Sequence, residues 1–130
     1  MDPKVVVERL FAAETRGDVE GIVALMHDEV VLHLSCRKVF GPDAVTDVRG
    51  KDAARRLYEE DVPRRGSAFS LHATRMIAEA TIVCAEWIAR CGPSGQDIRR
   101  GVDVFDVQGG TILRGAVYVD LATIPARGQT

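Results

Sequence analysis

The stretch that decides the fold runs from Phe69 to Leu121 and reads FSLHATRMIAEATIVCAEWIARCGPSGQDIRRGVDVFDVQGGTILRGAVYVDL. It contains four runs rich in β-branched and apolar residues, which predict strands over Phe69–Ala78, Thr81–Cys91, Asp97–Val107 and Thr111–Leu121. The breaks between them are short enough for hairpins: Glu79-Ala80, Gly92-Pro93-Ser94-Gly95 and Gly109-Gly110. We therefore expect these four strands to form an antiparallel meander.

The first residues of the chain have the pattern of helices. Asp2 can cap a helix that has Pro3 in its first turn and ends at Gly17. Asp18 can cap a second helix, whose apolar face extends to Met26 and which His27 ends.

The middle of the chain is predicted to hold one strand, one loop and one helix. The β-branched run Val30–Cys36 indicates a strand, and residues 37–49 have no clear period and indicate a loop. A third helix is expected over Lys51–Val62. Helices followed by an antiparallel meander indicate the α+β class rather than a parallel sheet.

Composition limits the function classes. A length of 130 residues indicates one domain, 1–130, with an ordered core over about 5–121 and a loose tail over 122–130. The formal net charge is 17 − 19 = −2, which argues against nucleic acid as the main partner. No apolar run reaches the roughly 20 residues of a membrane span, and no secretory signal is recognisable, so we expect a cytoplasmic protein.

The cysteine pattern argues against disulfides and metal. Cys36, Cys84 and Cys91 are odd in number and contain no C-x-x-C pair, so we expect free, buried cysteines that act as small apolar side chains. The histidines are scattered without ligand spacing, and no phosphate-binding or dinucleotide motif is present. The sequence predicts neither a metal nor an organic cofactor.

Residue alternation assigns some strand faces. On the Thr81–Cys91 strand, one face is expected to point towards the helices and consists of Ala85, Trp87, Ala89 and Cys91. On the last strand the apolar face consists of Leu113, Gly115, Val117 and Val119. Alternation leaves both faces open on the strands that contain His72 and Asp103.

Several local strings, in this order, resemble a known superfamily. They are Leu10–Asp18 (LFAAETRGD), Arg49–Tyr58 (RGKDAARRLY), Val102–Phe105 (VDVF) and Asp106–Arg114 (DVQGGTILR). From about Val5 to Leu121 the chain resembles the nuclear transport factor two-like superfamily, more narrowly its SnoaL-like and ketosteroid-isomerase-like members. The resemblance implies a curved sheet folded round a cone, with helices closing one side, a pocket inside and dimers formed through the outer sheet face.

The resemblance also implies a set of site residues. Asp103, a single carboxyl inside an apolar strand run, falls where ketosteroid isomerases keep a protonated aspartate that donates to an oxyanion. Tyr58 falls on a pocket tyrosine of the third helix, and His72, Trp87 and Val119 fall at inward strand positions. We expect catalytic roles for Asp103, His72 and Tyr58, with His72 and Asp103 meeting across the pocket as an acid/base pair.

A second set of residues is expected to bind substrate. It consists of Trp87, Leu34, Leu10, Phe105, Val117, Val119, Glu14 and Ser70. His33 is expected to point away from the pocket, and both arginine pairs, Arg64-Arg65 and Arg99-Arg100, are expected to be solvated.

The chain also departs from the resembled enzymes. Leu34 stands where the isomerases have their general-base aspartate, and Leu10 where they have their oxyanion tyrosine. The Arg-x-Asp and Asp of limonene-type epoxide hydrolases correspond here to Ala85, Trp87 and Val117.

These observations predict a cofactor-free acid/base enzyme for an apolar small molecule, such as a cyclase, dehydratase or isomerase of a polyketide- or terpenoid-like substrate. Two alternatives stay open. One is an epoxide hydrolase or epoxide-opening cyclase, for which only Glu14 or Asp61 could supply a second carboxylate. The other is a non-catalytic ligand-binding or dimerisation module. A homodimer is expected in each case.

Overall fold

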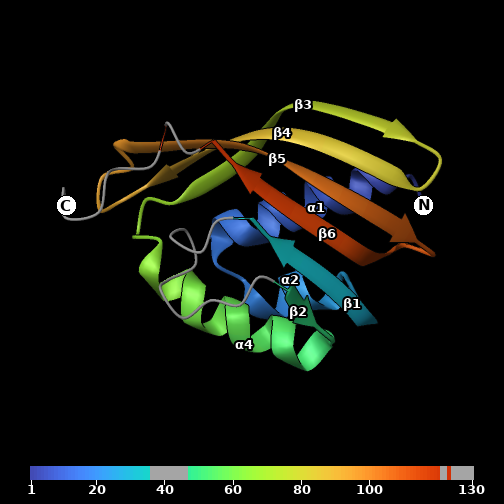
Figure 1. Ribbon diagram of the computed structural model, residues 1–130. Helices are drawn as coiled ribbons and strands as arrows, with labels where there is room; N and C mark the ends of the chain where they lie inside the picture. The colour runs from blue at the N-terminus through green and yellow to red at the C-terminus, as the bar shows by residue number, and fades with distance from the viewer. Residues whose placement is uncertain (36–46, 121–122, 124–130) are drawn as a thin grey trace.

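Among the residues that the structure describes, six strands form one curved sheet, and the helices lie on its concave side (Figure 1). The computed structural model describes residues 1–35, 47–120 and 123. In chain order the elements are α1 (Pro3–Arg16), α2 (Val19–Ala24), β1 (Met26–Leu34), β2 (Asp47–Arg49), α4 (Lys51–Asp61), the short 3-10 helix η1 (Val62–Arg64), β3 (Ser70–Glu79), β4 (Ile82–Cys91), β5 (Asp97–Gln108) and β6 (Thr111–Val119). The expected fold class, α+β with a curved mixed sheet, is confirmed.

The strand order is β2-β1-β6-β5-β4-β3. The meander from β3 to β6 is antiparallel throughout, as the hairpin breaks predict. β1 joins it in parallel with β6, with Leu34 opposite Val117. This parallel pair brings the first half of the chain against the meander, so residues of both halves face the same interior.

The ends of α1 follow the local signals. The side chain of Asp2 accepts a hydrogen bond from the backbone N–H of Lys4. Gly17 ends the helix at φ 67°, a left-handed conformation that glycine adopts without a Cβ penalty. Asp18 caps α2 through the backbone N–H of Gly21. These capping expectations are confirmed.

The second helix is shorter than expected. It ends at Ala24, and Met26 and His27 belong to β1 rather than to the helix. The reason is tertiary, because Met26 pairs with Ile112 of β6 and the N–H of Ile112 donates to the carbonyl of Leu25.

Within the expected loop 37–49, residues Asp47–Arg49 form the short strand β2, antiparallel to β1. The remainder of that loop, Cys36 and, apart from Thr123, the expected tail lie outside the described residues.

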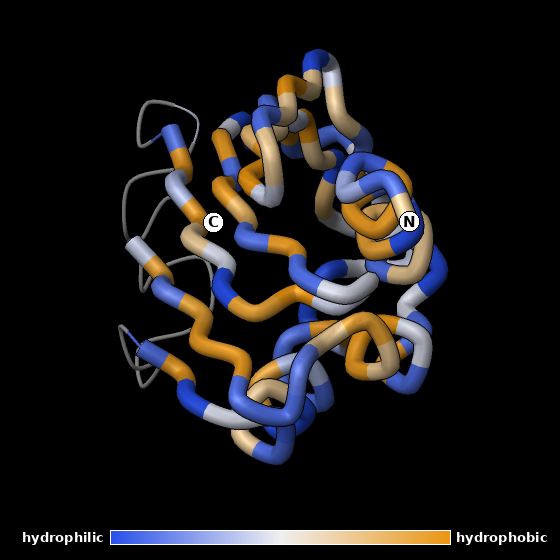
Figure 2. The backbone as a smooth tube through the Cα atoms, turned by 90° about the vertical axis from the view of Figure 1, so that its right-hand side faces the viewer, coloured by the Kyte–Doolittle hydropathy of each residue, from blue (hydrophilic) through white to orange (hydrophobic). Residues whose placement is uncertain are grey.

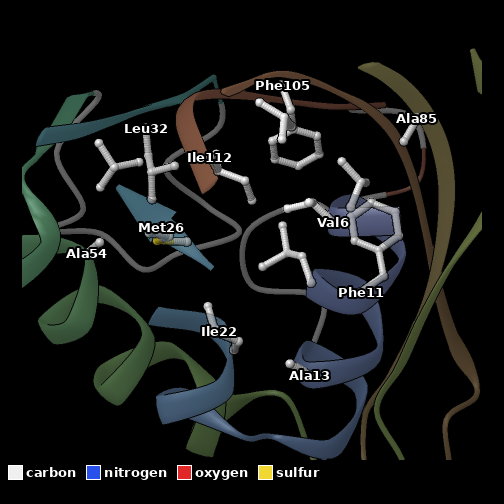
Figure 3. Packing of buried hydrophobic residues seen from close by; sticks show 14 of the residues in the cluster. Val6, Phe11, Ala13, Ile22, Met26, Leu32, Ala54, Ala85, Phe105 and Ile112 are labelled. Carbon is white, nitrogen blue, oxygen red and sulfur yellow. The ribbon is translucent and has the colours of Figure 1, made fainter. Parts of the chain in front are cut away.

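The core fills the space between the concave sheet face and the helices. Figure 3 shows side chains from α1, α2, β1, β5 and β6 pointing towards one another. Phe11 and Phe105 meet edge to face, with ring centroids 6.3 Å apart. Along the strands, hydrophobic and hydrophilic residues alternate (Figure 2), so one face of the sheet lies against the helices and the other faces outward.

One face assignment and the expected burial of the cysteines need correction. A β-bulge between Asp106 and Val107 shifts the register of β6, so that Ile112 is fully buried while Leu113 is only half-buried. Cys84 is exposed and Cys91 is half-buried, so neither is the buried apolar residue that we expected. Side chains alternate between the two faces along β4. Val83, Ala85 and Trp87 take the inward positions, so Cys84 points outward.

Candidate functional site

A cavity of about 240 Å³ lies inside the cone. Apolar side chains make up most of its wall, with a few ionisable groups among them. The residues that line it are Leu10, Glu14, Met26, Leu32, Leu34, Tyr58, Asp61, Arg64, Arg65, Phe69, Leu71, Trp87, Ala89, Cys91, Arg99, Asp103, Phe105, Val117 and Val119. A mainly apolar wall with a few convergent polar groups is typical of small-molecule sites.

Asp103 lies on the inward face of β5 and is 5% exposed. Its Oδ1 accepts a 2.8 Å hydrogen bond from the indole Nε1 of Trp87. Within the described residues its Oδ2 has no hydrogen-bond partner, although Asp103 lines the cavity. Burial raises the pKa of Asp103 well above its ordinary value, the charge of Glu14 raises it further, and the Trp87 hydrogen bond opposes both. Burial therefore favours the neutral, protonated form of the Asp103 carboxyl.

The strand register explains the contact between Trp87 and Asp103. Trp87 lies opposite Gly101, and Asp103 lies opposite Ala85, so the two side chains are diagonal neighbours on one face. A Cβ at Gly101 would lie 2.3 Å from the Trp87 ring. Gly101 therefore leaves the space beside β5 that the indole ring occupies, and from there its Nε1 reaches Asp103.

A buried ion cluster forms the wall where α1, α4 and η1 meet. Asp61 Oδ2 accepts from Arg65 Nε at 2.7 Å, and Glu14 Oε1 accepts from Arg65 Nη2 at 3.1 Å. The Arg65 side chain is only 10% exposed, so the expectation that it is solvated is wrong. Glu14 lies 51 residues away along the chain, which is why the local sequence around Arg65 gave no sign of this pairing.

Arg65 also contacts two aromatic rings. Its guanidinium carbon lies 4.6 Å from the centroid of the Phe69 ring and 5.9 Å from that of Tyr58. Its Nη1 is buried and has no hydrogen-bond partner among the described residues. The ring faces, whose electron density attracts a cation, therefore stabilise the part of the guanidinium that the carboxylates leave unpaired.

The electrostatics of the cluster differ from group to group. Burial raises the pKa of Glu14 above its ordinary value, and the opposing charge of Arg65 limits that shift. Burial disfavours the charge of Arg65, but the carboxylates of Glu14 and Asp61 outweigh it and raise the pKa of Arg65. Burial and nearby carboxylates raise the pKa of Tyr58 well above 10, so its hydroxyl stays protonated and can donate a hydrogen bond.

The structure brings most of the expected site residues together. Asp103, Tyr58 and Glu14 line the same cavity as the expected apolar wall of Trp87, Leu34, Leu10, Phe105, Val117 and Val119. Leu34 and Leu10, where the resembled isomerases have polar groups, are here part of that apolar wall.

His72 and Ser70 do not belong to this cavity. His72 is exposed and pairs with Ile88 on the outward face, whereas Leu71 and Ala73 lie opposite Ala89 and Trp87 of the inward face. Both His72 and Ser70 line a separate surface groove between α1 and β3. The expected meeting of His72 and Asp103 is therefore wrong. His33 pairs with Asp47 at 2.8 Å, and its side chain is 44% exposed.

The cavity also contains residues that the sequence did not predict for it. Arg65 and Arg99 were expected to be solvated, and Met26 was expected on a helix. The i, i+4 spacing of Asp61 and Arg65 was the only local sign of an ion pair in this region.

Two further findings concern metal and membrane. Over residues 1–35, 47–120 and 123, no group of three or more His, Cys, Asp or Glu side chains is placed to hold a metal ion. Among the same residues, no helix is both long enough and apolar enough to cross a membrane.

A curved sheet that wraps round a cavity, with helices on its concave side, is the fold of a class of small α+β domains that have an internal pocket. Residues 7–115 match the family model described as a SnoaL-like domain. The chain therefore belongs to the SnoaL-like family. Among curated proteins, no match was found.

Solved structures share the fold at low sequence identity. One is a Δ5-3-ketosteroid isomerase from Mycobacterium sp., with a TM-score of 0.77 and 21% identity over 96% of this chain and 98% of that one. Another is RV0760c from Mycobacterium tuberculosis in complex with estradiol-17β-hemisuccinate, with a TM-score of 0.76 and 19% identity over 95% and 98%. A third is a computationally designed 17-OHP binder, with a TM-score of 0.77 and 21% identity over 95% and 97%.

Proposed function

We propose that the protein is a cofactor-free enzyme that transfers a proton on an apolar small molecule, in an isomerisation, cyclisation or dehydration. The observation that carries the proposal is Asp103, a carboxyl buried in an apolar cavity and held at one oxygen by Trp87. A carboxylic acid kept neutral by its surroundings can donate a hydrogen bond at pH 7, as in ketosteroid isomerases. Polyketide- and terpenoid-like compounds are the substrate class that an apolar cavity of this size suits.

Asp103 is proposed as the acid. Its Oδ1 is engaged by the indole, so the proton is available on Oδ2, which has no partner among the described residues. A substrate carbonyl beside Oδ2 would accept this hydrogen bond, and the bond would strengthen as negative charge develops on the carbonyl oxygen. The protonated hydroxyl of Tyr58, on the same cavity wall, is a second candidate donor.

Glu14 is proposed as the base in place of His72. It lines the cavity, is 8% exposed, and its charge is close enough to raise the pKa of Asp103. Burial raises the pKa of Glu14 above its ordinary value even though Arg65 opposes the rise, so its carboxylate is a stronger base than an exposed glutamate. In the proposed step, Glu14 removes a proton from the carbon next to a carbonyl while Asp103 stabilises the enolate oxygen.

Hydrogen–deuterium exchange tests this step whatever the final product of the reaction. A panel of bicyclic and steroidal ketones is incubated with the protein in D₂O, and loss of the α-proton signal is followed by NMR. We expect catalysed exchange for at least one ketone, with Asp103→Asn and Glu14→Gln each slower by about 10²-fold or more. Glu8→Gln, on the same helix but outside the cavity lining, is the matched control. Binding of ketones without any exchange would refute the proposal in favour of a non-catalytic binding module.

Epoxide opening is a second candidate function. It requires a further carboxylate beside the acid, and both Glu14 and Asp61 line the cavity that contains Asp103. Both carboxylates are bound to Arg65, which keeps them aligned but weakens them as nucleophiles. Hydrolysis of a terpenoid epoxide that is abolished by Asp61→Asn, with ketone exchange absent, would favour this candidate.

A homodimer through the outer sheet face is also proposed. This face presents Val102, Val104 and Ala116, which are half-buried in the single chain, and Tyr118, which is 47% exposed. A contiguous apolar patch on a sheet is typical of an interaction surface. Light scattering should give twice the chain mass at micromolar concentration, and Val104→Arg should give the monomer mass. A monomeric wild-type protein would contradict the proposal.

A further inference from the structure

Two arginines on the cavity wall have no acidic partner among the described residues. Arg64 is exposed and takes part in none of the ion pairs found there. Arg99 is half-buried, and among the described residues its Nη1 donates only to the backbone carbonyls of Ile98, at 3.3 Å, and Thr123, at 3.2 Å. Both contrast with Arg65, whose charge is matched by Glu14 and Asp61. A wholly apolar ligand would make no favourable electrostatic interaction with these two cations.

Arg64, Arg65 and Arg99 line the same cavity as Cys91. Burial raises the pKa of the Cys91 thiol, and the nearby positive charges of Arg99 and Arg65 oppose that rise. Asp97 and Asp61 also raise this pKa, but within the described part of the chain Asp97 makes no ion pair with an arginine, and Asp61 is paired with Arg65. The carboxylates of Glu14 and Asp61 are already bound to Arg65, so they are not available to neutralise Arg64 or Arg99.

The charge balance of the cavity agrees with this geometry. Its wall carries three arginines, Arg64, Arg65 and Arg99, and three carboxyls, Glu14, Asp61 and Asp103. Among the described residues, Glu14 and Asp61 are paired with Arg65, and Asp103 is hydrogen-bonded to Trp87, so Arg64 and Arg99 are left without an acidic partner. A negatively charged group on a ligand would supply that partner.

We propose that the ligand of this cavity is amphipathic, with an apolar body inside the cone and an oxyanion, such as a carboxylate, sulfonate or phosphate, held by Arg64 and Arg99. The inference rests on the proposed function only in that both assign an apolar ligand to the same cavity. Arginine is suited to this role because its guanidinium presents several donors in one plane to an oxyanion.

Two fluorescent probes of nearly the same shape test the inference independently of the enzyme's reaction. N-phenyl-1-naphthylamine is neutral, whereas 1-anilinonaphthalene-8-sulfonate carries one negative charge on a similar apolar body. Their dissociation constants are measured at low ionic strength with the full chain, its Arg64→Gln/Arg99→Gln double variant, and Arg100→Gln. Arg100 is exposed and lies outside the cavity lining, so it controls for the loss of a surface charge.

We expect the sulfonate to bind about tenfold more tightly than the neutral probe, a preference worth about 1.4 kcal/mol. The double variant should remove this preference and leave the affinity for the neutral probe unchanged, and Arg100→Gln should retain it. Added salt should reduce the preference, because the two arginines are partly in contact with solvent.

Each of the other outcomes contradicts one of the two proposals or the assumption that they share. Equal affinity for the two probes, or a preference that persists in the double variant, overturns the oxyanion inference and leaves the proposed function intact. Failure of both probes to bind overturns the apolar-ligand assignment on which both proposals rest. Val117→Phe narrows the cavity, and sulfonate binding that this variant leaves unchanged would place the probe elsewhere and overturn the inference.

Discussion

Trp87 on β4 and Asp103 on β5 are joined by a hydrogen bond of 2.8 Å from the indole Nε1 to Oδ1. The bond is buried and links the largest aromatic side chain of the cavity to a carboxyl whose pKa burial raises well above its ordinary value. It fixes the carboxyl plane and leaves Oδ2 for a ligand. Since a buried polar group without a partner is costly, the same bond makes the position of Asp103 tolerable in an apolar wall.

Replacing Trp87 with Phe should raise the pKa of Asp103 further. The indole hydrogen bond stabilises the carboxylate form, so its loss leaves burial and the charge of Glu14 unopposed. NMR titration of selectively labelled aspartate carboxyls measures the shift. The carboxyl of Asp61, which is bound to Arg65 and not to Trp87, serves as an internal reference, and an unchanged or lowered Asp103 pKa would contradict the prediction.

Asp103 should make the fold less stable as the pH rises. Below its ordinary pKa of 3.8 the group is protonated in both the folded and the unfolded chain. As the pH rises past that value the unfolded chain releases the proton and the folded chain keeps it, so the free energy of unfolding falls by up to about 1.4 kcal/mol per pH unit. The loss ends once the pH exceeds the raised pKa of the folded state. The shift of Glu14 acts in the same direction.

Asp103→Asn should therefore be more stable than the wild type near pH 8 and should show a shallower pH slope. Urea denaturation at several pH values between 4 and 8 measures both effects. Asp106→Asn removes a carboxyl from the same strand and should keep the wild-type slope. A variant curve parallel to the wild-type curve would show that Asp103 is ionised in the folded protein.

Arg65→Met should cost about 3–5 kcal/mol of folding free energy, because it leaves the buried carboxyls of Glu14 and Asp61 without their cation. The matched control is Arg75→Met. Arg75 forms an exposed ion pair with Glu86, a kind of pair that contributes about 0–1 kcal/mol. Denaturation curves at pH 7 compare the two, and similar costs would mean that the Arg65 cluster is solvated in solution.

Gly101→Ala should destabilise the protein by about 1–3 kcal/mol and move Trp87. The added methyl would lie 2.3 Å both from the Trp87 ring and from the backbone oxygen of Tyr118. Gly115→Ala is a milder comparison, since its Cβ would lie 3.1 Å from a flexible Leu32 side chain. Trp87 is the only tryptophan, so its fluorescence reports the displacement. Identical spectra and stabilities for both variants would refute the close contact.

Local sequence predicted much of the secondary structure because the deciding interactions are local. Alternating apolar residues and glycine-containing breaks indicated β3 to β6, and Asp2 and Gly17 marked the ends of α1. The short α2 and the early start of β1 were missed, since they depend on the pairing of Met26 with Ile112, 86 residues away. The resemblance to a known family supplied the curvature and the cavity, which no residue pattern here encodes by itself.

The sequence by itself determined that one carboxyl, Asp103, lies within an apolar strand run beside small neighbours. Only the tertiary structure decided its partners. Strand register placed Trp87 beside it and turned His72 outward, because a shift of one residue moves a side chain to the opposite face of the sheet. Arg65 stands in a segment that reads as an exposed turn, and it is buried because Glu14 on α1 and Asp61 on α4 meet there. A buried charge is tolerated only where an opposite charge lies beside it. Because Glu14 is far from Arg65 in the sequence, no local pattern predicts that the two side chains meet.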